Sequence, residues 1–222
     1  MNKIKEWLEQ LKLVFEKRTV DAIFPPVVFF LMNQWLSIEY ASGITLGLLM
    51  VLIIYRKVKG QTEKYAFVGV GGVLLSIGFS LLSGEAIDYY IPDLLMTGLI
   101  VIACFVSLII RRPLAALLSH LTRGWPIGWY MRKDVQPAYK RVTIIWGIYF
   151  LIRLILQGFL FLRREYTGYF LVNTILGMPM NIFILIISYV YGVAILRKLS
   201  GPSVDEYTNE KEPPYEGQKS GF

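Results

Sequence analysis

Six apolar runs, separated by short polar stretches, organise this chain of 222 residues. A helix needs about 20 apolar residues to cross the hydrocarbon core of a bilayer, within a range of about 17–25. The first run carries Asp21 near its start, and Pro25 and Pro26 interrupt its early turns, so a broken or re-entrant helix is the alternative there. The runs predict transmembrane spans at 20–37, 40–56, 65–83, 90–110, 142–162 and 169–196.

Lys and Arg residues fall in every second connection between these runs. Of the 23 basic residues, 20 lie in the segments 1–18, 56–64, 111–141 and 197–222. Basic loops are retained on the cytoplasmic side of a membrane protein. The pattern therefore predicts an all-α polytopic integral membrane protein. Its six transmembrane helices would form three hairpins, with both termini in the cytoplasm.

Composition agrees with this prediction. Hydrophobic residues make up 55% of the chain and charged residues 18%, and the mean hydropathy is +0.52, outside the usual range of soluble domains. A net charge of +7 would otherwise suggest a nucleic-acid partner, but the basic loops account for it, so we expect none. The single cysteine, Cys104, can form no intramolecular disulfide. The expected partner is the lipid bilayer.

Two segments outside the spans have amphipathic helical patterns. One is the N-terminal cytoplasmic segment 1–18, and the other is 112–124, where the sequence 124–126 (GWP) ends the helix. Both should lie in the headgroup layer, and anionic-lipid sensing or docking of a partner is the functional alternative. The residues predicted to contact the membrane surface around the second segment are Arg111, Arg112, Leu114, Leu118 and Trp125.

These features divide the chain into three parts. The N-terminal helix is 1–18, and the transmembrane domain is 19–198. The segment 199–222 is polar and rich in Gly and Pro, which predicts a disordered cytoplasmic tail.

The third span has small residues at helical spacing along one face. Because apolar helices gain no hydrophobic energy by associating in lipid, close approach at small residues is a main source of contact. We expect a helix-packing seam at Gly69, Gly72, Ser76 and Ser80.

Polar residues within the spans are the best candidates for a functional site, because they are costly to place in lipid. The candidates are Asn33, Asp93, Arg153, Gln157, Asn173 and Asn181. Asn181 is the expected neighbour of Arg153, since Asp93 lies nearer the outside, and the sequence 177–179 (GMP) should kink the last span. One interpretation is a polar network that fixes helix register. The other is a substrate or ion path around Arg153 and Asn181.

Enzymatic chemistry has little support in the sequence. The only histidine, His120, lies on the amphipathic segment, so a histidine-based metal site or triad cannot be built. No carboxylate pair, nucleophile elbow or phosphate-binding loop is present. We expect no enzyme activity, no metal and no cofactor.

Several short motifs together resemble a known family. They are the segment 21–30 (DAIFPPVVFF), the basic turn 56–59 (RKVK), the motif 112–114 (RPL) and the span start 146–150 (WGIYF). In this order they resemble the bacterial intracellular septation protein A family. The form 111–114 (RRPL) and the longer first half are still more similar to the related membrane proteins of unknown function grouped as DUF3159.

The resemblance implies a multi-pass protein of the bacterial cytoplasmic membrane. In the septation relatives the associated role is cell division and envelope integrity, through contacts with division and elongation proteins. We therefore expect a non-enzymatic role in the cell envelope, with lipids, other membrane proteins or a second copy of the chain as partners. The alternative is a small transporter or channel subunit.

Overall fold

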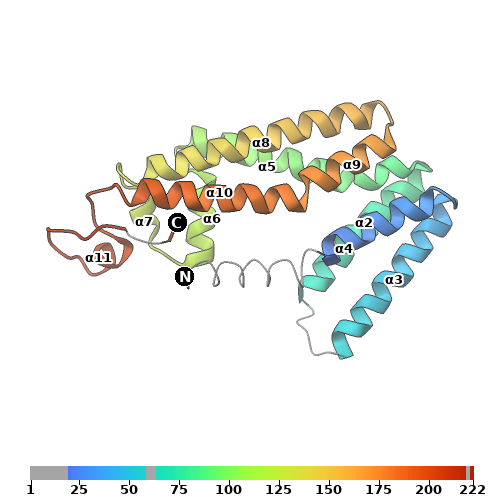
Figure 1. Cartoon of the computed structure of the whole chain (residues 1–222), viewed down its shortest axis with the longest axis horizontal. Helices are drawn as coiled ribbons and strands as arrows, with labels where there is room; N and C mark the ends of the chain where they lie inside the picture. The colour runs from blue at the N-terminus through green and yellow to red at the C-terminus, as the bar shows by residue number, and fades with distance from the viewer. Residues whose placement is uncertain (1–19, 59–63, 219–220) are drawn as a thin grey trace, which may run out of the picture. The chain divides into compact units, whose positions relative to one another are not determined.

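The computed structural model describes residues 20–58, 64–218 and 221–222. The predicted N-terminal helix at 1–18 lies outside the described residues. The described part is helical, without strands, and Figure 1 follows its elements along the chain. They are α2 (Val20–Asn33), α3 (Ile38–Val58), α4 (Lys64–Ser83), the 3-10 helix η2 (Ala86–Tyr90), α5 (Ile91–Ile109), α6 (Leu114–Arg123), α7 (Ile127–Tyr130), α8 (Gln136–Leu162), α9 (Tyr166–Leu176), α10 (Met178–Leu196) and α11 (Val204–Thr208).

Four stretches of the described residues are long and apolar enough to cross a membrane. They are Ile38–Tyr55, Ala86–Ile109, Gln136–Leu162 and Tyr166–Leu196. The described part of α2 and the stretch Gly71–Ser83 of α4 are also apolar. The four long stretches match the second, fourth, fifth and sixth predicted spans.

The helices form two compact units, which are described separately. The first holds the described residues up to Leu95 together with Gln157–Met178, and the second holds Met96–Leu156 and Pro179–Phe222. The core of the first unit is aromatic. Its fully or almost fully buried side chains are Phe29, Ala41, Ile77, Ile87, Tyr89, Tyr90 and Tyr169. Its rings stack, with centroids 4.3 Å apart for Phe29 and Tyr89 and 4.7 Å apart for Tyr90 and Tyr169.

The core of the second unit gathers around α7. The side chains of Trp129 and Tyr130 are completely buried there, with residues of α6, α8, α10 and α11 packed around them. The buried set is Ala115, Ala116, Trp129, Tyr130, Val135, Ala138, Tyr139, Val142, Leu196 and Val204. This core therefore joins the loop after α5 to the segment that follows α10.

Two predicted interruptions lie where the sequence placed them. Helix α6 ends at Arg123, and Gly124 follows with a φ of +70°, a left-handed conformation that glycine adopts without steric cost. The last apolar run is divided at Gly177, between α9 and α10. A Cβ at Gly177 would lie 2.3 Å from the backbone oxygen of Asn173, so only glycine fits that break.

The tail differs from the prediction of disorder. Val204–Thr208 form the short helix α11, and Ser203 and Glu206 make a reciprocal capping box at its start. The Phe222 ring stacks on Tyr139 of α8 with centroids 4.2 Å apart. Polar composition favours disorder only when a segment has no core to join, and here the apolar side chains of Val204 and Phe222 pack on the core of the second unit.

Candidate functional site

Three of the predicted polar residues meet within the first unit. Gln157 of α8 donates from Nε2 to Asp93 Oδ2 of α5 at 2.7 Å and to Asn173 Oδ1 of α9 at 3.2 Å. The Gln157 side chain is completely buried. All three helices belong to stretches long enough to cross a membrane. The cluster thus places one carboxylate and two carboxamides inside apolar helices.

The remaining polar atom of Gln157 distinguishes this cluster from an ordinary helix–helix contact. Within the described residues its oxygen Oε1 is buried and has no hydrogen-bond partner. A buried acceptor without a donor is destabilising by about 1–3 kcal/mol. The cluster can therefore accept one more hydrogen bond, from water or from a bound solute.

The second unit contains two further polar pairs between α8 and α10. Tyr149 donates to Asn181 Oδ1 at 3.0 Å, and Trp146 Nε1 donates to Ser188 Oγ at 2.8 Å. Arg153 lies between Tyr149 and Gln157 on α8, at four-residue spacing that puts the three on one helical face. Its side chain is buried, with 5% exposed. The expected neighbour of Arg153 was Asn181. The Asn181 side chain accepts a hydrogen bond from Tyr149, which lies one helical turn before Arg153 on α8.

The other predicted residues of the spans lie elsewhere. Asn33 is the last residue of α2 and makes no side-chain hydrogen bond with another described residue. In the small-residue seam, Ser80 is completely buried and donates to the Glu85 carbonyl at 3.2 Å. Gly72 is exposed, and a Cβ built there would meet no atom within 4 Å. Ser76 is half-buried, and the surroundings of Gly69 lie outside the described residues. Within the described part, only the Ser80 end of this face is closely packed.

The predicted membrane-surface residues surround α6. Arg111, Arg112 and Leu118 are exposed, whereas Leu114 and Trp125 are half-buried. The buried face of α6 is made by small residues, Ala115, Ala116 and Ser119. The only histidine, His120, bonds through Nδ1 to the Trp125 carbonyl at 2.6 Å.

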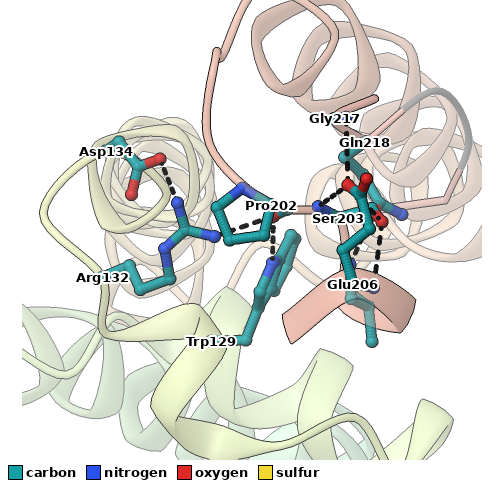
Figure 2. A network of polar contacts seen from close by, with 9 residues as sticks. Trp129, Arg132, Asp134, Pro202, Ser203, Glu206, Gly217 and Gln218 are labelled. Atoms are coloured by element: carbon teal, nitrogen blue, oxygen red, sulfur yellow. Dashed lines mark hydrogen bonds and ion pairs between the residues drawn. The ribbon is translucent and has the colours of Figure 1, made fainter. Parts of the chain in front are cut away.

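Sequence reasoning missed a polar network that holds the tail, shown in Figure 2. Trp129 Nε1 and Arg132 Nη1 both donate to the Pro202 carbonyl, at 3.0 and 2.7 Å. The carboxylate of Glu206 accepts hydrogen bonds from the backbone N–H groups of Ser203, Glu216 and Gly217. These N–H donors, those of Glu216 and Ser203 above all, lower the pKa of Glu206 to about 2. The spacing Ser203-x-x-Glu206 was the available signal, because it is the pattern of a capping box.

Titratable groups elsewhere serve the fold. Arg164, after α8, forms ion pairs with Asp88 at 2.6 Å and Glu85 at 3.0 Å. In α7, burial raises the pKa of the Tyr130 hydroxyl, which lies 3.0 Å from Ser119 Oγ. No three His, Cys, Asp or Glu side chains of the described residues lie close enough together to hold a metal ion.

Long apolar helices that enclose buried polar side chains define the class: this is an all-helical membrane protein. The chain belongs to the family described as protein of unknown function DUF3159, whose model matches residues 17–199. No curated protein and no solved structure matches the chain.

Proposed function

We propose that the chain is a small transporter or channel subunit that binds a polar solute at Asp93, Gln157 and Asn173. The observation that carries this proposal is the completely buried Gln157, whose Nε2 is bonded to Asp93 and Asn173 while Oε1 has no partner in the described part. A solute or water that donates to Oε1 would satisfy that acceptor. Intramembrane polar and ionisable residues commonly mark substrate paths. Within the second unit, Arg153 and the pair of Tyr149 with Asn181 are a separate candidate for such a path. Catalysis has no part in the proposal.

The proposed setting is the bacterial cytoplasmic membrane, crossed six times with both termini inside. Two contacts support that topology. Arg164 pairs with Asp88, which joins two loops that the charge pattern places outside. Trp129 bonds to the Pro202 carbonyl, which joins two segments that the pattern places inside. Each of these contacts joins segments that the charge pattern assigns to the same side of the membrane, which agrees with the alternation of basic loops.

Flux through liposomes tests the solute path. The full chain would be reconstituted, and entry of glycerol, urea, Na⁺ and K⁺ would be followed by light scattering and ion-sensitive dyes. Gln157→Leu keeps the side-chain size but removes both polar atoms. Because the solute would lose its hydrogen bond to Oε1, which is worth about 1.4 kcal/mol, we expect flux to fall about tenfold or more. Ser188→Ala, which loses the bond from Trp146 and the one that Ser188 donates to the Ile184 carbonyl of its own helix, is the control and should retain flux.

If the folded wild type conducts none of these solutes, or if Gln157→Leu conducts as well as the wild type, the proposal is wrong. Folding of each variant would be checked by thermal unfolding in detergent. A variant that unfolds early would be replaced by Gln157→Met, which has a similar length.

A second candidate is a non-enzymatic role in the cell envelope, through contacts with division or wall-synthesis proteins, lipids or a second copy. The observation in its favour is that the pairs Trp146–Ser188 and Tyr149–Asn181 bind neighbouring helices to each other, as a network that fixes helix register would. Arg153→Gln separates the candidates. A transporter should lose flux and keep its fold, whereas a scaffold should tolerate the change or lose stability. Crosslinking of the tagged chain in its native membrane, followed by mass spectrometry, would identify partners.

A further inference from the structure

The turn between α5 and α6 holds two exposed arginines in a strained backbone. Arg111 has a φ of +57°, a conformation that non-glycine residues rarely adopt. Strain of this kind persists only where the surroundings impose it, and it is concentrated at functional sites. Both Arg111 and Arg112 are exposed.

Three hydrogen bonds impose this turn. The Gln136 side chain donates from Nε2 to the Arg111 carbonyl at 2.7 Å. The Arg112 N–H donates to the Ser107 carbonyl at 2.9 Å, and the Leu114 N–H donates to Ser107 Oγ at 3.1 Å. Both sides of the turn are thus fixed by residues of α5 and α8, so the two guanidinium groups start from a rigid base.

The charge around the turn is one-sided. Between positions 107 and 147 the chain has seven basic residues and one acid, Asp134. That acid is bonded to Arg132 at 2.6 Å. No described carboxylate forms an ion pair with Arg111 or Arg112. Within the described residues, this surface has basic groups without an acidic partner, so it can bind an anion.

Apolar side chains next to the turn show what kind of surface carries that anion. Ile109 and Ile110, just before Arg111, are 78% and 55% exposed, and Leu118 and Leu121 of α6 are 42% and 76% exposed. Helix α6 is attached to α8 by its other face, since the Ala115 N–H donates to Thr143 Oγ1 at 3.1 Å. Exposed leucines on a helix that starts five residues after a membrane-length helix belong in the headgroup layer.

We propose that the Arg111–Arg112 turn binds the phosphate of anionic phospholipid headgroups, with Leu118 and Leu121 inserted among the lipids beside it. Arginine is suited to this role because its planar guanidinium donates two parallel hydrogen bonds to a phosphate. The site does not depend on the solute path proposed above, because none of its residues belongs to that cluster.

Lipid retention by the purified full chain tests the proposal. The delipidated protein in detergent would be titrated with phosphatidylglycerol or phosphatidylcholine, and bound lipids would be counted by native mass spectrometry. We expect the wild type to retain phosphatidylglycerol in preference. Arg111→Asn keeps a residue that tolerates a positive φ, and it should weaken retention about fivefold, as expected for about 1 kcal/mol per basic side chain at an anionic surface. Arg112→Gln should do the same, and Arg111→Lys should retain most of the binding.

Arg164→Asn is the matched control. Arg164 has a φ of +55° and is half exposed, but its charge is neutralised by Asp88 and Glu85. Its replacement should leave phosphatidylglycerol retention unchanged. Equal retention of the two lipids by the wild type, equal losses in Arg111→Asn and Arg164→Asn, or no loss in the Arg111 and Arg112 variants would each overturn the proposal. Displacement of the lipid by an equal concentration of inorganic phosphate would overturn it too, since the site would then be a free-anion site.

Discussion

Arg164 and Arg111 have the same backbone conformation in different surroundings. Each follows a long apolar helix, with a φ of +55° after α8 and +57° after α5. The Arg164 guanidinium contacts Asp88 and Glu85, so it joins the segment after α8 to the loop before α5. No described acid forms an ion pair with Arg111. Both strained turns thus present an arginine side chain. Where acids lie next to it, as at Arg164, the arginine holds two segments of the fold together. Where no described acid pairs with it, as at Arg111, the arginine can bind a ligand.

The two units also use their buried acids differently. Asp88, 8% exposed, binds a guanidinium. Glu206, also 8% exposed, binds mainly backbone N–H groups and Lys211 of its own tail. The contacts of Glu206 therefore lie within the tail itself, and among the described acids neither Glu206 nor any other forms an ion pair with Arg111.

The largest effect is expected from breaking the Arg164 pair. Arg164→Gln leaves the buried Asp88 carboxylate without its cation. We expect the free energy of unfolding to fall by about 2 kcal/mol, less than for a fully buried pair because Arg164 is half exposed. Thermal unfolding in detergent would measure the loss. Arg163→Gln, an exposed neighbour that lies over the Phe159 ring, is the control and should lose about 0.5–1 kcal/mol at most. Equal losses of unfolding free energy at the two positions would show that the ion pairs of Arg164 do not stabilise the fold.

A smaller effect of opposite sign is expected at Arg111. Arg111→Gly removes the steric cost of the left-handed conformation, which is about 1–2 kcal/mol. Part of that gain is lost to the greater freedom of glycine in the unfolded chain, so we expect a net stabilisation of about 0.5–1 kcal/mol. Arg164→Gly has the same backbone gain but loses the ion pair, and should be less stable than the wild type. Thermal unfolding in detergent would measure the stability of both variants. If both variants were more stable than the wild type, or both less stable, the two arginine turns would not differ as proposed.

The smallest effect on the stability of the whole fold concerns Glu206, because its contacts lie within the tail. Its pKa of about 2 lies below the usual 4.5, so the carboxylate contributes stability that is fully present above 4.5 and is lost as the pH falls toward 2. We expect resistance of the tail to an acid-tolerant protease to be constant down to about pH 5 and to decline below it. In Glu206→Gln the decline should be absent, with the tail already open at pH 7. Protection that holds unchanged to pH 2 would mean that Glu206 does not hold the tail.

Local patterns were enough to predict the four membrane-length stretches and two interruptions. Gly124 ends α6 and Gly177 divides the last apolar run, because glycine tends to end or kink a helix whatever surrounds it. The contacts that build the sites are long-range. Asp93 and Gln157 are 64 positions apart in the chain, and Arg164 and Asp88 are 76 apart.

Periodicity assigns a residue to a face of its helix but does not select its partner on another helix. For that reason Arg153 and Gln157 could be predicted as polar residues of the interior, whereas the pairing of Asn181 with Tyr149 could not. The ordered tail was missed on similar grounds. Composition carried no sign that Phe222 packs on Tyr139, 83 positions earlier.

The break at Gly177 has a consequence for the fit between the protein and its bilayer. The stretch Tyr166–Leu196 has 31 residues, which as one straight helix would measure about 46 Å, half as long again as a hydrocarbon core of about 30 Å. The break divides it into rods of 11 and 19 residues, about 16 and 28 Å long. Each rod alone is no longer than the hydrocarbon core, so a bilayer that holds either rod need not thicken and the rod need not tilt to avoid hydrophobic mismatch.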